Sequence, residues 1–168
     1  MLEVVLGSVF DQDCDAIVNP ANQSLLAGSG LCGVIHKLAG PELEIACKKL
    51  GRQEIGDAVI TPAFNLKNCQ YIIHACGPRW LDGTYGEREL LAKTYKNIID
   101  LANAAQLKKI AIPAISTGIY KFPIEQSAEI AIENCISESS IKLDLNLIIS
   151  DPNTYRMYTE VYKYKFSI

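Results

Sequence analysis

The sequence predicts an α/β fold in which helices pack on a mixed central sheet. Short apolar runs of strand length alternate along the 168 residues with longer segments in which apolar residues recur at helical spacing. Two of the apolar runs, 57–62 and 71–76, are joined by a polar link too short for a helix, which indicates antiparallel neighbours. The alternation of strands and helices elsewhere favours an α/β sandwich.

The expected strands are rich in aliphatic residues and end at residues that disfavour a sheet. They are 2–6, 16–18, 57–62, 71–76, 109–115 and 143–149. The second strand is expected to stop before Asn19-Pro20, because proline cannot donate to a strand ladder and restricts the residue before it.

The expected helices span about 30–40, 42–50, 87–106 and 124–137, and a last helix opens at Asp151-Pro152. The segment 87–106 has the clearest pattern, since Leu91, Tyr95, Ile98 and Ala102 follow one another at helical spacing. Tyr155, Tyr158 and Tyr162 are expected to form a packing face of the last helix. Glu87 and Glu89 are expected to be solvated at a helix start, and Asp11, Asp13 and Asp15 to lie in a polar loop within possible reach of an adenine.

Length and charge narrow the class of protein. We expect a single domain covering 1–168, which is long enough to bury a core. A net charge of −3 and a pI near 5.4 provide no general attraction to nucleic acid or to anionic membranes. No apolar run approaches the roughly 20 residues that span a bilayer, and the first residues lack the pattern of a signal peptide.

The cysteines and histidines predict neither a metal centre nor a cofactor. The cysteines are Cys14, Cys32, Cys47, Cys69, Cys76 and Cys135. They contain no CxxC pair, and most have apolar neighbours, which favours a reduced cytoplasmic protein. The two histidines are far apart in the sequence. We expect His74 to be a core residue and His36 to be structural or on the surface.

Two polar loops are expected to form one anion-binding site. The loop 19–33 follows a strand, contains several glycines and runs into a helix start; the loop 116–120 follows another strand. Glycine lets a backbone approach a ligand closely, and a helix start offers unpaired N–H groups. Because ligands of such sheets bind beyond the carboxyl ends of strands, the two loops are predicted to hold a diphosphate between them.

A dinucleotide or triphosphate site is less consistent with these residues. Gly28, Gly30 and Gly33 spell GxGxxG, but a polar loop separates them from the preceding strand, whereas the Rossmann fingerprint follows its strand directly. The sequence also has no Walker lysine.

Three stretches together resemble the macro domain, the ADP-ribose-binding module. They are DAIVNPANQSLLAGSGLCGVIHKLAGPEL, IIHACGP and IAIPAISTGIYKFP, in the order and spacing of that family. The resemblance implies a three-layer α/β/α sandwich with a mixed central sheet. It also implies a cleft that takes ADP-ribose, either free or attached to a protein.

The resemblance also implies roles for particular residues. Asn22 matches the asparagine that contacts the distal ribose, 28–33 and 116–120 match the two phosphate loops, and Tyr120 lies near the distal ribose. The candidate ligand-binding residues are Ser8, Val9, Asn22, Gly28, Ser29, Gly30, Leu31, Cys32, Gly33, Ser116, Thr117, Gly118, Ile119 and Tyr120.

Three positions depart from the family pattern. The run Gly7-Ser8-Val9 stands where the family often has Gly-Asp-Ile, so an adenine contact is weakened or replaced. Ser150 stands where many members have an aromatic that stacks on adenine, and Tyr155 is a possible substitute. Cys32 replaces the aspartate of one hydrolase branch, and a thiol with a pKa of about 8.5 is a poor substitute for a carboxylate.

Three functions remain open at this point. The first is a module that binds ADP-ribose or mono-ADP-ribosylated protein. The second is an ADP-ribosyl hydrolase or O-acetyl-ADP-ribose deacetylase in which Asn22 is catalytic, slowed by the absence of the aspartate. Cys32 is expected to be a small space-filling residue rather than a nucleophile. The third is an RNA-binding or protein-interaction module, which the acidic composition disfavours. We expect a monomer with no nucleic acid partner.

Overall fold

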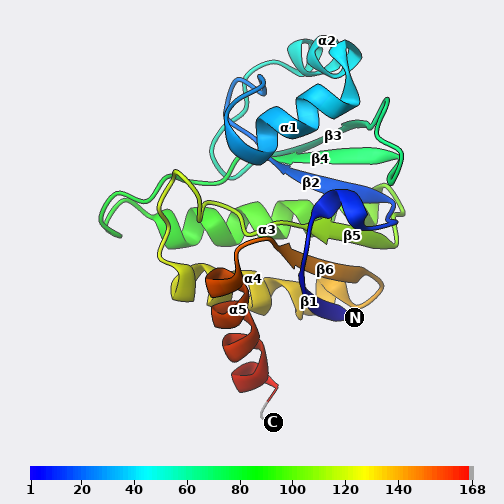
Figure 1. The fold of residues 1–168 in the computed structure, drawn as a ribbon. Coiled ribbons are helices and arrows are strands. Elements are labelled where there is room, and N and C mark those ends of the chain that lie inside the picture. The colour runs from blue at the N-terminus through cyan, green and yellow to red at the C-terminus, as the bar shows by residue number, and fades with distance from the viewer. Residues whose placement is uncertain (167–168) are drawn as a thin grey trace.

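The computed structural model describes residues 1–166 and contains a six-stranded mixed sheet (Figure 1). The strands are β1 (Leu2–Leu6), β2 (Ala16–Pro20), β3 (Ala58–Pro62), β4 (Tyr71–Ala75), β5 (Lys109–Ile112) and β6 (Asp144–Ile149). They lie in the order β1-β6-β5-β2-β4-β3. Every neighbouring pair is parallel except β3 and β4, which confirms the predicted antiparallel pair.

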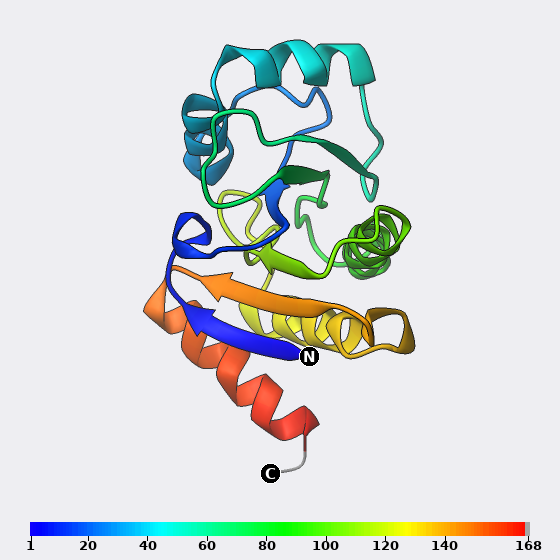
Figure 2. The ribbon, with the colours of Figure 1, turned by 90° about the vertical axis from the view of Figure 1, so that its right-hand side faces the viewer.

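Five α-helices cover the two faces of this sheet. They are α1 (Gly30–Ala39), α2 (Pro41–Leu50), α3 (Glu87–Ala104), α4 (Ile124–Cys135) and α5 (Pro152–Lys165), with short 3₁₀ turns η1 (Val9–Asp11) and η2 (Glu138–Ser140). One core lies between the sheet and α1 and α2; a larger core lies between the sheet and α3, α4 and α5. Figure 2 shows α3 almost end-on beside the sheet. The three-layer α/β/α sandwich is therefore confirmed.

Alternation along β2 shows how one strand serves both cores. Ala16 and Val18 belong to the larger core, whereas Ile17 belongs to the core under α1 and α2. All three side chains are fully buried. Because successive side chains of a strand point to opposite faces, a strand covered on both sides is mostly apolar. The polar exception in β2 is Asn19, which is fully buried and lies beside His74.

The carboxyl ends of β2 and β5 differ from the expectation. β2 continues through Asn19 and Pro20, because proline takes the last position and the next residue, Ala21, donates its N–H to Ala75 O (2.9 Å). β5 ends at Ile112 instead of continuing to Ile115, since Pro113 has no N–H to extend the ladder.

No helix within residues 1–166 has the length and apolar character needed to cross a bilayer.

The expectation that Glu87 is solvated is wrong. Its side chain is only 2% exposed, and its carboxylate accepts hydrogen bonds from backbone N–H groups of the preceding loop. Glu89, in the same helical turn, is exposed as expected. The sequence pattern alone could not distinguish these two residues, because the partners of Glu87 are backbone groups placed by a loop.

His74 lies in the core, as predicted, and is held by polar neighbours. Its Nδ1 lies 3.0 Å from Nδ2 of Asn19, and its Nε2 lies 2.9 Å from Oγ1 of Thr61. His36 is also buried, with its ring centre 6.5 Å from that of His74. Burial, and secondarily the charge of a protonated His36, lowers the pKa of His74 to about 3, so its imidazole is neutral in the folded protein.

Acidification is expected to destabilise the fold through His74. Between pH 6.5 and 3 the unfolded chain binds a proton that the folded chain excludes, so this contribution to stability is complete above the ordinary pKa of 6.5 and falls below it. Between pH 7 and 5 the free energy of unfolding should fall by about 2 kcal/mol. Urea unfolding at the two pH values measures it. In the variant His74→Gln the free energy of unfolding should fall by less over the same pH range, and an equal fall would contradict the assignment to His74.

Candidate functional site

A cavity of about 850 Å³ opens at the carboxyl edge of the parallel strands. Its walls come from the segments that follow β1, β6, β5, β2 and β4. Strand β3 runs in the opposite direction, so its carboxyl end lies beside the amino ends of the other strands, and it contributes nothing to the lining. The position agrees with the general rule that ligands bind beyond the carboxyl ends of strands in α/β sheets.

The order of the strands sets the order of the residues along the cavity. Ser8 and Asp151 follow the neighbouring strands β1 and β6 at one end. The loop 113–120 follows β5 in the middle. Asn22 and the start of α1 come after β2, and Gly77 follows β4 at the opposite end. The cavity is therefore an elongated cleft that crosses several strand ends.

Every candidate ligand-binding residue except Gly33 lines this cleft. Gly33 lies behind the first loop, where a β-carbon would come within 2.2 Å of Gly28 O. Its role is therefore to let α1 pack closely against the loop that precedes it.

The first loop presents the start of α1 to the cleft. Gly30 has φ = +62°, a backbone angle that favours glycine, and the helix begins there after Ser29. The unpaired N–H groups and the positive end of the helix dipole favour an anion at this place. Asn22 braces the loop, because its side chain donates to Leu26 O (2.9 Å) and accepts from Leu26 N (3.2 Å).

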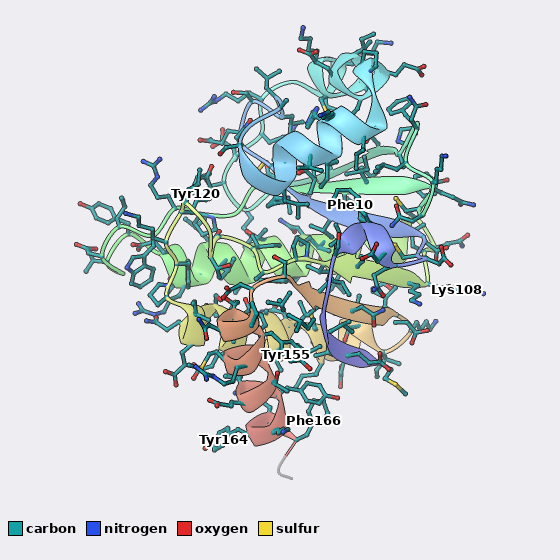
Figure 3. The ribbon with its side chains drawn as sticks, in the orientation of Figure 1. Phe10, Lys108, Tyr120, Tyr155, Tyr164 and Phe166 are labelled. Carbon is teal, nitrogen blue, oxygen red and sulfur yellow. The ribbon has the colours of Figure 1, made fainter. Side chains whose placement is uncertain are left out.

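The second loop, 116–120, is held in a strained turn. Ser116 has φ = +68°, and its carbonyl accepts the N–H of Phe122 (2.9 Å). The Ser116 hydroxyl is buried and has no hydrogen-bond partner within the described part of the chain. A side chain at Gly77 would come within 2.5 Å of that hydroxyl, so the glycine leaves the room the loop needs. Figure 3 shows Tyr120 near the outer end of this loop.

Comparison with known proteins agrees with this geometry. The sequence model of the Macro domain matches residues 18–131. The chain belongs to the macro domain family. A relative named O-acetyl-ADP-ribose deacetylase 1, from Pantoea vagans, is 40% identical over 167 residues, which cover 95% of this chain and 97% of that protein.

Solved macrodomains have the same fold. The structure of the Oceanobacillus iheyensis macrodomain with ADP is 35% identical in sequence and has a TM-score of 0.93. The match covers 99% of this chain and 92% of the Oceanobacillus chain. The Trypanosoma brucei macrodomain in complex with ADP-ribose is 27% identical, covers 96% of this chain and 68% of its own, and has a TM-score of 0.85.

Cys32 of this macro domain lies in the cleft as a thiol. Its side chain is 6% exposed, and its Sγ is 3.6 Å from Leu26 O, to which it donates. Burial raises the pKa of Cys32, and hydrogen bonds from Gly28 and Asn19 only partly oppose this effect. At neutral pH the sulfur is therefore neither a base nor an activated nucleophile.

The opposite end of the macro domain cleft contains small polar residues. The Ser8 hydroxyl accepts the N–H of Phe10 (3.2 Å), and Ser150 lines the wall beside it. Tyr155 lies on α5 (Figure 3), packs against the larger core and is not among the residues that line the cleft. Asp11, Asp13 and Asp15 are not in the lining either; Asp15 accepts the N–H groups of 108 and 109.

Asp151 and Thr154 line the cleft but were not among the candidate residues. Asp151 caps α5, since its Oδ2 accepts both the N–H and the hydroxyl of Thr154 at 2.9 Å. These hydrogen bonds lower the pKa of Asp151 and keep it ionised. The sequence Asp-Pro at a helix start indicated the cap, but its place beside Ser8 depends on the pairing of β1 with β6.

Within residues 1–166 no group of three His, Cys, Asp or Glu side chains is arranged to hold a metal ion.

Replacing Gly33 with alanine should destabilise the first loop. The added β-carbon would meet a backbone oxygen at 2.2 Å, so either α1 or the loop must move. Overpacking of this kind costs on the order of 1–3 kcal/mol in the free energy of unfolding. Chemical denaturation measures the loss, and faster amide exchange in 26–33 should accompany it.

Gly118→Ala is the matched control, because its β-carbon would have no neighbour within 4 Å. Equal stability of the two variants would contradict the packing role of Gly33.

Proposed function

We propose that this macro domain binds ADP-ribose, free or attached to a protein. The observation that supports this most is that two backbone loops, 28–32 and 116–120, line one cleft together with the start of α1. Backbone N–H groups and a helix start are suited to a diphosphate. The relatives' ligands, ADP and ADP-ribose, have this group in common.

The cleft suggests one direction for the ligand. The adenine would lie at the end formed by Ser8, Val9 and Asp151, and the diphosphate between the two loops. The terminal ribose would then lie near Asn22 and Tyr120, at the β4 end. A volume of about 850 Å³ suits a ligand of this size, since small-molecule pockets measure about 300–1,000 Å³.

Calorimetric titration with ADP-ribose tests the proposal. Saturable binding of one ligand per chain is expected, and Asn22→Ala should weaken it about tenfold, because the terminal ribose loses a partner and the loop loses its brace to Leu26. Asn103→Ala is the control, since Asn103 is exposed and bonds Ser139 O instead. Absence of heat at high-micromolar ADP-ribose would refute the proposal.

Hydrolysis is a second candidate, supported by the relative named O-acetyl-ADP-ribose deacetylase 1. In the release of ADP-ribose from a protein, Asn22 would orient the terminal ribose while a water attacks the anomeric carbon and the protein side chain leaves. Cys32 cannot activate that water as a base, because burial keeps its pKa raised. A general base typically raises the rate by a factor of about 10²–10⁴. Because Cys32 cannot act as one, turnover should be slow or absent.

Release of acetate from O-acetyl-ADP-ribose, or of ADP-ribose from a mono-ADP-ribosylated protein, measures this activity. Cys32→Ser should leave any rate unchanged, since the thiol performs no step. Cys32→Asp should raise the rate if the position can accept a carboxylate. A rate abolished by Cys32→Ser with binding intact would show instead that the thiol takes part.

We infer a cytoplasmic location, because six free cysteines suit a reducing compartment. All six are free thiols, and burial raises the pKa of each of them.

A further inference from the structure

The loop 79–86 supports the second phosphate loop from outside the cleft. The N–H of Trp80 donates to Tyr120 O (2.9 Å), and the Trp80 ring packs edge-on against Phe122, with ring centres 5.0 Å apart. The guanidinium of the neighbouring Arg79 lies 5.8 Å from the centre of the Tyr120 ring. The position of Tyr120, which contacts two residues that follow β4, therefore depends on how this loop is held.

A single buried carboxylate holds the loop. Oε2 of Glu87 accepts the N–H groups of Leu81 (3.1 Å), Asp82 (3.1 Å) and Gly83 (2.8 Å), and Oε1 accepts the N–H of Tyr85 (2.6 Å). Burial alone would raise the pKa of Glu87, but these backbone donors outweigh it and lower the pKa to about 2. The group is therefore ionised over the whole working range of pH.

The same loop is packed closely around Trp80. Arg88 lies 5.1 Å from the Trp80 ring centre and donates to Gly83 O (3.2 Å). Gly83 has φ = +88°, and a β-carbon there would come within 2.9 Å of the Trp80 ring. Loss of the carboxylate would leave the loop N–H groups unpaired and free Trp80 to shift.

We infer that Glu87 is a positioning residue for the terminal-ribose end of the cleft, acting through the loop 79–86 and Trp80 on Tyr120. This inference rests on the proposed function. Glu87 does not line the cleft, and of the two residues in 116–122 that Trp80 contacts, Tyr120 lines the cleft whereas Phe122 does not. Its effect should therefore fall mainly on the part of the ligand beyond the diphosphate.

Comparison of ADP-ribose with ADP tests this, because ADP lacks the terminal ribose. Glu87→Ala should weaken ADP-ribose about tenfold and change ADP affinity by less than about twofold. Glu87→Gln retains one acceptor oxygen and should have a smaller effect of the same kind. Glu89→Ala is the matched control, since Glu89 lies in the same helical turn but is exposed.

Trp80 provides a second readout, because it is the only tryptophan of the chain. Its fluorescence should become more accessible to iodide in Glu87→Ala and remain unchanged in Glu89→Ala. If Glu87→Ala does not fold, Gly83→Ala perturbs Trp80 with the carboxylate in place and should produce the same selective loss of ADP-ribose binding.

The outcomes separate this inference from the proposed function. Failure of the unmodified protein to bind ADP-ribose would refute the proposed function. Normal binding by the unmodified protein, with equal losses for both ligands or no loss in the Glu87 and Gly83 variants, would overturn the positioning role alone.

Discussion

Parallel pairing of five strands is the constraint on which the cleft depends. Because β1, β6, β5, β2 and β4 run in one direction, their carboxyl ends and the loops after them meet at one edge. No single loop encloses the cavity. Residues separated by more than a hundred positions, such as Ser8 and Ser116, become parts of one site only through the hydrogen bonds of the sheet.

Backbone groups, rather than charged side chains, dominate the central part of the site. The glycines of the first loop and the left-handed turn at Ser116 bring backbone to the cleft, and no lysine or arginine of residues 1–166 is part of its lining. This explains how an acidic chain can offer a place for an anion. It also explains why close packing, as between Gly33 and Gly28, matters as much as the lining residues.

The parts of the fold that could be predicted are those determined by local pattern. Apolar runs and helical spacing located all six strands and five helices, and Gly28–Gly33 indicated the first loop. The prediction failed where the partner is distant or is backbone. Glu87 has the same local setting as Glu89, and only the path of 81–85 makes it buried. Asp151 joins the site because β6 pairs with β1, which no short motif encodes.

The six free thiols, five of them buried and Cys14 half-buried, have a practical consequence for work with this protein. Because all six have a raised pKa, only a small fraction is thiolate near neutrality, and thiolate is the form that maleimides attack. A cysteine introduced at an exposed position, such as 119, should therefore accept a fluorescent or spin label while the native six remain in place. Distance measurements across the mouth of the cleft then require no cysteine-free background.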